Sequence, residues 1–209
     1  MRQWSDNHPK AQLLMRKRAA ILNAAAEAFL QMGYEGVSME GIANAAGVSI
    51  MTLYRHAKRK EDLFAAVIAN ACDHSSADEQ AEFDRLMQMP LQDALVKVGT
   101  LFQEKLASPQ VTSLLRVVIT EAIRFPDLAE TAYNALFNVW AVTLDAFLAQ
   151  NQSFRGVSAK ARRKASEAFF SRLVGVDAIR MLLGLKGATA KEWRERAEIS
   201  ASELLAKMN

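Results

Sequence analysis

The positions of the prolines are the strongest constraint on what this chain can fold into. Its four prolines stand at 9, 90, 109 and 126, so none interrupts residues 10–89. A proline inside a helix removes a backbone donor and clashes with the preceding turn, so its absence permits long helices. We find no convincing period-2 alternation and no Asn-Gly or Asp-Gly hairpin turn. Leu, Ala, Glu, Lys, Arg and Met, which favour helices, are abundant. We therefore predict an all-α fold.

Apolar periodicity and turn residues divide the chain into helices. Acidic and small residues dominate 73–84, so we expect a connector there, between an N-terminal domain at 11–72 and a C-terminal domain at 73–209. Ser38 and Ser49 are the expected N-caps, although Gly41 deprives Ser38 of a capping-box partner. The expected helices run from about 11 to 33, from Ser38 to Gly47, onward from Ser49 and from near Arg59, and then over 91–107, 109–124, 126–151, 158–185 and 189–208.

Composition bounds the class of protein. Apolar residues make up 51% of the chain, which is enough for a sizeable core. There is no run of about 18 apolar residues, so we expect no membrane span, and the polar first residues do not resemble a secretory signal. The single cysteine, Cys72, rules out an intramolecular disulfide and fits a reducing compartment. We therefore expect a cytoplasmic protein.

Basic residues are concentrated in the first third of the chain. Residues 1–70 hold nine Lys or Arg against six Asp or Glu, whereas the other 139 residues hold 17 of each sign. The net charge of +3 therefore arises entirely near the N-terminus. It indicates either a polyanionic partner at that end or simply a solvated basic face.

The segment 39–56 has the pattern of two short helices joined by a tight turn. Ala43 is small where such helices would touch, Gly47 can adopt the positive φ of the turn, and Val48 can fill the space beneath it. The Ser49 hydroxyl can accept a hydrogen bond from a free backbone N–H of the second helix. The N-terminal end of that helix would then reach base edges in a DNA major groove. The pattern predicts a helix-turn-helix.

A set of residues in 14–68 carries a family resemblance: Arg18, Ile21-Leu22, Ala25-Ala26, Phe29, Gly33-Tyr34, Ile42-Ala43, Ala46-Gly47-Val48-Ser49, Thr52-Leu53-Tyr54, His56 and Lys60-Glu61-Asp62-Leu63. This region resembles the DNA-binding domain of the TetR family of regulators. The resemblance implies an N-terminal three-helix DNA-binding domain and a helical C-terminal domain for ligand binding and dimerisation. It also implies a homodimer on a palindromic operator and, for most members, repression, which in many a small-molecule effector relieves.

The resemblance further implies which residues contact DNA. It places Ser38, Tyr54, His56 and Lys60 against phosphates, and Ile50, Met51, Thr52 and Arg55 against the major groove. Arg18, Ser49 and Lys58 complete the predicted DNA-binding set. Because two of the groove residues are apolar and cannot hydrogen-bond to bases, we expect specificity to depend on Arg55, Thr52 and DNA shape.

One position departs from the family pattern. The family usually has an aromatic residue directly after the histidine, where this chain has Ala57. That ring normally anchors the end of the recognition helix in the core. We expect Phe29, Phe64 or a slightly shifted helix to fill the space, and the pose of His56 depends on which does.

The C-terminal helices offer candidates for dimerisation and ligand binding. Nearly every face of 169–183 is apolar, so this helix should be buried on more than one side. With the last helix it could form a four-helix interface with a two-fold mate. The expected interface residues are Phe170, Val174, Met181, Trp193, Ala197 and Leu204. The ligand candidates, each of which could instead be a core, surface or interface residue, are Arg116, Glu121, Asn138, Trp140 and Asp177.

Four functions compete. The leading hypothesis is a ligand-responsive repressor that binds a palindromic operator as a homodimer. The alternatives are an activator or ligand-independent regulator, a helical enzyme or small-molecule carrier, and a sequence-blind DNA compactor. The sequence has no P-loop, Gly-x-Ser-x-Gly, His-Glu-x-x-His or cysteine pair. We therefore expect no catalytic residue, no cofactor and no metal site.

Overall fold

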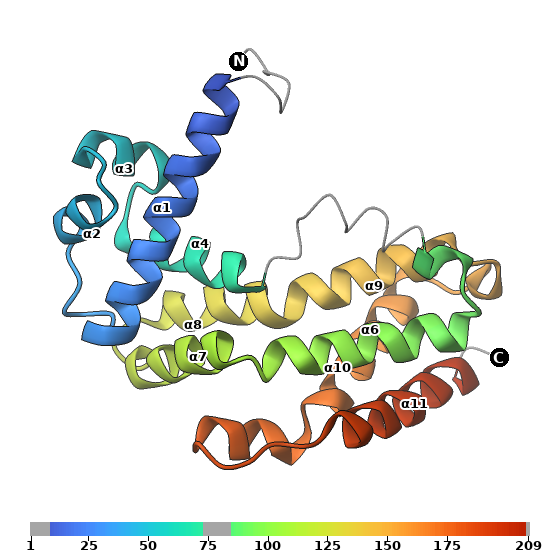
Figure 1. Cartoon of the computed structure of the whole chain (residues 1–209). Helices are drawn as coiled ribbons and strands as arrows, with labels where there is room; N and C mark the ends of the chain where they lie inside the picture. The colour runs from blue at the N-terminus through green and yellow to red at the C-terminus, as the bar shows by residue number, and fades with distance from the viewer. Residues whose placement is uncertain (1–8, 73–84, 208–209) are drawn as a thin grey trace. The chain divides into compact units, whose positions relative to one another are not determined.

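The computed structural model describes residues 9–72 and 85–207, and every regular element in those ranges is a helix (Figure 1). The predicted all-α fold is confirmed. The chain forms two compact units: the first combines the described residues up to Ala71 with Ser113–Ala132, and the second contains the described residues of 72–112 and 133–209. The prediction had two consecutive domains, whereas residues 113–132 belong with the N-terminal helices. The predicted connector at 73–84 and the side chain of Cys72 lie outside the described residues.

The first unit is built around an aromatic cluster. Phe29, Tyr34 and Phe64 are fully buried, and the Phe64 ring meets the other two edge-on at centroid distances of 4.8 and 5.4 Å. A proline begins each of the last two helices of this unit, as predicted. Proline is tolerated there because a residue in the first turn of a helix needs no backbone N–H donor. Its helices are α1 (Pro9–Met32), α2 (Met39–Ala45), α3 (Ile50–His56), α4 (Lys60–Cys72), α7 (Pro109–Glu121, from Ser113 onward) and α8 (Pro126–Tyr133).

The second unit has its own core. In it α6 packs against α10 and α11, and α9 packs against α10. Phe102 of α6 lies 5.4 Å from the Trp140 ring and 4.8 Å from the Phe170 ring, measured between centroids. Its elements are α6 (Leu91–Leu106), the π-helical turn η1 (Asn134–Asn138), α9 (Val139–Gln150), the 3-10 turn η2 (Gln152–Phe154), α10 (Ala159–Leu182) and α11 (Ala190–Ala206). Every helix within 9–72 and 85–207 is too short or too polar to cross a lipid bilayer.

Two predicted helices contain irregularities that the sequence pattern did not reveal. The helix expected over 126–151 contains the π-helical turn at Asn134–Asn138. The helix expected over 158–185 is broken inside α10 at Gly175, whose φ is 53° and ψ is −170°. Each irregularity changes which side chains face the core in the residues that follow it.

The break divides α10 into two halves with opposite surroundings. Phe169, Phe170 and Leu173 of the first half are buried. In the second half, the side chains of Val176 and Ile179 are 73% and 58% exposed. Within a single chain, only the first half therefore meets the expectation that 169–183 is buried on more than one side, and burial of the second half against a two-fold mate stays a prediction.

Candidate nucleic-acid interface

The turn between α2 and α3 is closed by backbone hydrogen bonds around a glycine. Gly47 has a φ of 63°, its N–H donates to the Asn44 carbonyl over 3.1 Å, and the Val48 N–H donates to the Ala43 carbonyl over 3.0 Å. These two bonds form the Schellman motif, in which a residue of positive φ ends a helix. An added Cβ at this glycine would meet no atom within 4 Å. Glycine is therefore favoured here by backbone conformation and not by crowding.

Both predicted N-caps are present. The Ser38 hydroxyl accepts a hydrogen bond from the Gly41 N–H over 3.0 Å, and the Ser49 hydroxyl accepts one from the Thr52 N–H over 3.2 Å. A cap of this kind satisfies a backbone donor that the first helical turn leaves free. Leu53, fully buried, holds α3 to the core as expected. Each of the two short helices is thus capped at its N-terminus, and α3 is also anchored in the core.

The outer face of α3 carries most of the residues predicted to read DNA. Met51 is 72% exposed, Tyr54, Arg55 and His56 are also exposed, and Ile50 is half-buried. This face therefore presents a flexible apolar group, a phenol and a guanidinium together. Such a set can contact thymine methyls, phosphates and guanine edges.

Thr52 does not lie on that face. It is only 9% exposed, and its hydroxyl oxygen lies 2.9 Å from the Ser49 hydroxyl oxygen. A guanidinium N–H of Arg55 also reaches this oxygen, over a long 3.5 Å. Because Thr52 supports the cap from inside the helix, it has little surface to offer a groove, which corrects its predicted base contact.

Basic groups from two helices meet at the end of α3. Partial burial lowers the pKa of the His56 imidazole, and the positive charges of Arg18 on α1 and Arg55 on α3 lower it further. Arg18, Lys58 and Ser38 are exposed, as a set of phosphate contacts requires. The structure therefore brings Arg18 of the first helix near the end of the recognition helix, and its contact with DNA stays a prediction.

Lys60 is used inside the protein. Its Nζ donates to the carbonyls of Tyr34, Glu35 and Val37 at 2.9, 3.3 and 3.1 Å, and lies 4.6 Å from the centroid of the Tyr34 ring. An ammonium has three N–H donors, so all of them are engaged with the α1–α2 connection. The predicted phosphate contact of the Lys60 side chain is therefore corrected: this side chain joins the start of α4 to the loop before α2.

Ala57, the departure from the family pattern, is buried in extended conformation directly after α3, with a φ of −146° and a ψ of 124°. Phe29 and Phe64, two of the groups expected to fill the space of the missing ring, are fully buried and in edge-to-face contact. His56 is the last residue of α3 and is exposed. The recognition helix thus reaches the histidine despite the small residue that follows.

The five ligand candidates do not form one site. In the second unit, Asn138 accepts a hydrogen bond from Arg163, Trp140 packs on Phe102, and Asp177 pairs with Arg196. In the first unit, Arg116 and Glu121 line a cavity of about 370 Å³ between the end of α1 and one face of α7. The other residues that line this cavity are Leu30, Gly33, Ser113, Val117 and Thr120. No three His, Cys, Asp or Glu side chains gather as a metal site within the described part of the chain.

Half of the predicted dimer residues lie in the protein interior. Phe170, Ala197 and Leu204 are buried in the core of the second unit, so they have no surface to offer a partner, which corrects their assignment. Val174, Met181 and Trp193 are half-buried. The exposed apolar residues in the second half of α10 and the turn after it are Val176, Ile179, Leu183 and Leu185, which the interface prediction did not include.

Sequence reasoning missed two further features of this region. Thr189 and Glu192 form a capping box at the start of α11, and the Thr-x-x-Glu spacing that signals it is present in the sequence. Arg196 contacts both Asp177 and the Leu173 carbonyl across the break in α10. Gly175, an isolated glycine inside a helical pattern, was the available signal for that break.

A capped helix-turn-helix with a basic, exposed recognition helix, joined to a larger helical unit, defines a regulator of the DNA-binding class. Residues 21–67 match the model of bacterial regulatory proteins of the TetR family, and residues 93–204 match the C-terminal domain of AefR-like transcriptional repressors. The chain belongs to the TetR family. Both models describe regulators and not enzymes, so the enzyme alternative is set aside.

Two curated relatives share part of the chain. The transcriptional repressor ComR of Escherichia coli K12 is 28% identical over 139 residues, which is 65% of each protein. The transcriptional activator FasR of Mycolicibacterium smegmatis is 40% identical over 58 residues, 28% of this chain and 26% of FasR. The chain thus spans less than two thirds of the length of either relative.

Solved structures extend the similarity to nearly the whole chain. A protein of Mesorhizobium loti described as a TetR-family transcriptional regulator is 25% identical, with a TM-score of 0.71 over 93% of this chain and 97% of that one. The flavonoid-responsive regulator FrrA is 26% identical, with a TM-score of 0.69 over 92% of this chain and 97% of that one. Both units of the chain are therefore of the TetR type.

Proposed function

We propose that this chain is a sequence-specific transcriptional regulator that binds a palindromic operator as a homodimer. The observation that carries the proposal is the exposed face of α3, where Met51, Tyr54 and Arg55 point away from a helix fixed by Ser49 and Leu53. A helix capped at one end and buried along one side can insert its other side into a major groove.

The small size of the recognition surface supports the homodimer. α3 has seven residues, so one copy can contact only a few base pairs. Two copies related by a two-fold axis would read two half-sites about 34–36 Å apart, or a multiple of that. The exposed apolar residues Val176, Ile179 and Leu183 are an argument for a dimer interface, because an apolar patch on a protein surface commonly marks an interface.

We propose repression as the mode of regulation. The C-terminal half matches a model named for repressors, and ComR is a named repressor, whereas FasR is a named activator over a shorter match. A reporter gene placed behind the selected operator tests this point. Expression should rise when the regulator is deleted, and a fall on deletion would make the chain an activator.

We further propose that a small molecule releases the regulator from DNA. The cavity lined by Arg116 and Glu121 supports this, since it touches α1 of the DNA-binding unit, and FrrA, a structural relative, is named for its response to flavonoids. Naringenin, a flavonoid, is the first probe. It should lower operator affinity, and Arg116→Met or Glu121→Gln should weaken its effect, whereas the exposed control Lys97→Met should not. An operator affinity that naringenin leaves unchanged would contradict a flavonoid effector.

Selection of bound sites from random duplex DNA tests the main proposal. The purified chain should enrich an inverted repeat, and its affinity for that repeat should exceed its affinity for scrambled DNA by about 10³-fold or more. Equal affinity for all duplexes at moderate salt would instead support the sequence-blind DNA compactor.

A further inference from the structure

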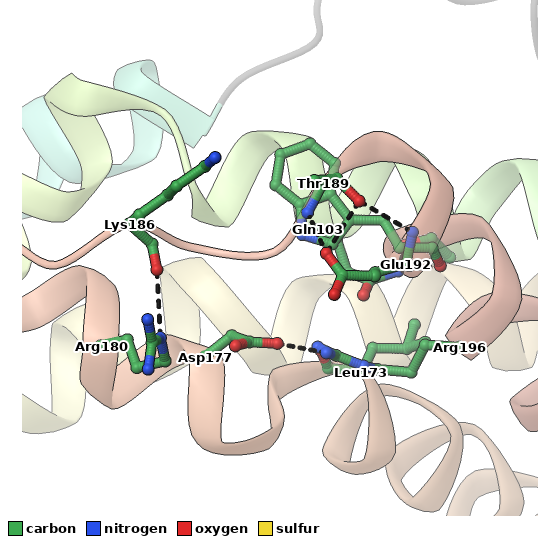
Figure 2. Close-up of polar contacts among 10 residues, drawn as sticks. Gln103, Leu173, Asp177, Arg180, Lys186, Thr189, Glu192 and Arg196 are labelled. Atoms are coloured by element: carbon green, nitrogen blue, oxygen red, sulfur yellow. Dashed lines mark hydrogen bonds and ion pairs between the residues drawn. The ribbon is translucent and has the colours of Figure 1, made fainter.

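A side chain of another helix reaches α10 at its break. Gly175 is not helical, so α10 bends there. Arg196 of α11 donates from Nη1 to the Leu173 carbonyl over 3.3 Å and from Nη2 to the Asp177 carboxylate (Figure 2). One guanidinium thus contacts α10 on both sides of the break. Asp177 and Arg196 are both partly buried, which protects the pair from solvent screening.

Gly175 is favoured at the break by its backbone conformation, and it also lies against Arg196. Its φ of 53° and ψ of −170° lie in a region that is essentially open only to glycine. An added Cβ would also lie 3.3 Å from Nη1 and 3.6 Å from Cζ of Arg196. The arginine therefore packs directly against the glycine, and the two residues determine the bend together.

The far end of the second half of α10 is also fixed. Arg180 donates to the Lys186 carbonyl over 3.1 Å, and the Leu185 N–H donates to the Arg180 carbonyl over 2.8 Å. α11 begins at the capping box of Thr189 and Glu192, and Gln103 of α6 donates to the Trp193 carbonyl over 2.9 Å (Figure 2). Local hydrogen bonds therefore close the turn after α10, the start of α11 is held by its own cap and by α6, and the outer side of the second half of α10 stays uncovered.

The uncovered side is an apolar stripe. Val176, Ile179 and Leu183 recur at helical spacing and are 73%, 58% and 71% exposed. A two-fold contact places the same surface against itself, so a charged residue at its centre would meet its own copy and repel it. A stripe of three aliphatic side chains meets no such repulsion, and a second copy of this chain is the occupant that it suits.

We propose that Arg196, Asp177 and Gly175 are positioning residues for the homodimer. Their contacts set the bend of α10, and the bend sets the angle at which Val176, Ile179 and Leu183 meet the second copy. This inference rests on the homodimer of the proposed function. It adds that the geometry of the dimer depends on a contact made within each protomer.

Sedimentation equilibrium of Arg196→Met tests the inference. The substitution keeps most of the length of the side chain but removes the guanidinium that makes both contacts, and it should weaken dimerisation by at least about tenfold. Arg194→Met is the matched control, because Arg194 stands two residues earlier on α11 and forms an exposed ion pair with Glu198. The control should dimerise like the wild type, and far-UV circular dichroism should show unchanged helix content for both.

A second readout separates positioning from general stability. Site selection with half-sites at varied spacing should give one preferred spacing for the wild type and a broader or shifted preference for Arg196→Met. Asp177→Asn, which leaves the Leu173 contact in place, should show a smaller change in the same direction, and it carries the test if Arg196→Met does not fold. If both variants dimerise with the affinity of the wild type and prefer the same half-site spacing, the inference is overturned, but the proposal of a homodimer is not affected. A monomeric wild type would overturn the homodimer itself.

Discussion

At the scale of the residue, His56 is the side chain whose charge should depend on DNA. In the free protein its pKa is lowered by partial burial and by Arg18 and Arg55, so the imidazole is neutral near pH 7. A phosphate beside it would stabilise the protonated form, so binding should take up a proton. Operator affinity should therefore rise as the pH falls from about 8 to about 6. Fluorescence anisotropy at constant ionic strength measures this, and His56→Gln should lose the dependence. A flat wild-type profile would mean that no phosphate lies near His56.

Arg55 is the only exposed side chain on α3 with the geometry to read guanine. Arg55→Ala should reduce operator affinity by roughly 1–3 kcal/mol and relax the sequence preference at one position. Competition between operator and scrambled duplex measures both effects. Equal losses on the two duplexes would show that Arg55 contacts a phosphate and reads no base.

At the scale of the element, Lys60 should stabilise the DNA-binding unit without touching DNA through its side chain. Lys60→Met would leave the carbonyls of Tyr34, Glu35 and Val37 without their donor, and should lower the free energy of unfolding by about 1–3 kcal/mol. Urea denaturation followed by circular dichroism measures the change. Lys58→Met, at an exposed position two residues earlier, should leave stability nearly unchanged. A similar stability for both variants would argue against the three contacts.

The elements themselves were largely predictable because their signals are local. Ser38, Ser49, Gly47, Pro109 and Pro126 each determine a helix end through contacts within a few residues, and the structure places helix ends beside all of them. The outward face of α3 followed from the same local geometry. Sequence reasoning was therefore sufficient to find most of the exposed surface of α3 that we propose contacts DNA.

What could not be predicted depends on partners distant in the sequence. In the sequence, Lys60 cannot be distinguished from a basic residue that contacts DNA after a recognition helix. Its actual partners are backbone carbonyls that lie 23 to 26 positions earlier in the chain. The family resemblance placed Thr52 against the major groove, whereas in the structure its hydroxyl lies beside the Ser49 hydroxyl in a partly buried position. The exposed half of α10 was expected to be buried because an apolar pattern does not distinguish a core from an interface.

At the scale of the whole molecule, DNA binding should depend on dimerisation. Ile179→Asp would place a carboxylate in the centre of the proposed interface and should yield a monomer. Affinity for the inverted repeat should fall by roughly 10²-fold or more, because the two recognition helices would no longer act at high effective concentration. Affinity for a single half-site should not change. Sedimentation and anisotropy measure the two effects.

A matched control exists for this test. Ile123, between α7 and α8, is 92% exposed and belongs to the first unit, outside the proposed interface. Ile123→Asp should remain a dimer and retain operator affinity. A dimeric Ile179→Asp would mean that the second half of α10 is not where the copies meet.

The π-helical turn at Asn134–Asn138 has a consequence for how the chain serves two interiors. Leu128 and Ala132 are buried in the first unit, and Ala141 and Leu144 are buried in the second. The buried positions advance by four residues up to Leu136 and then by five to Ala141. One wide turn adds a residue, and a residue rotates an α-helix by about 100°. The chain can thus contribute to one hydrophobic core and then to the next without a loop. The single extra residue corrects the angular offset between the apolar faces that serve the two cores.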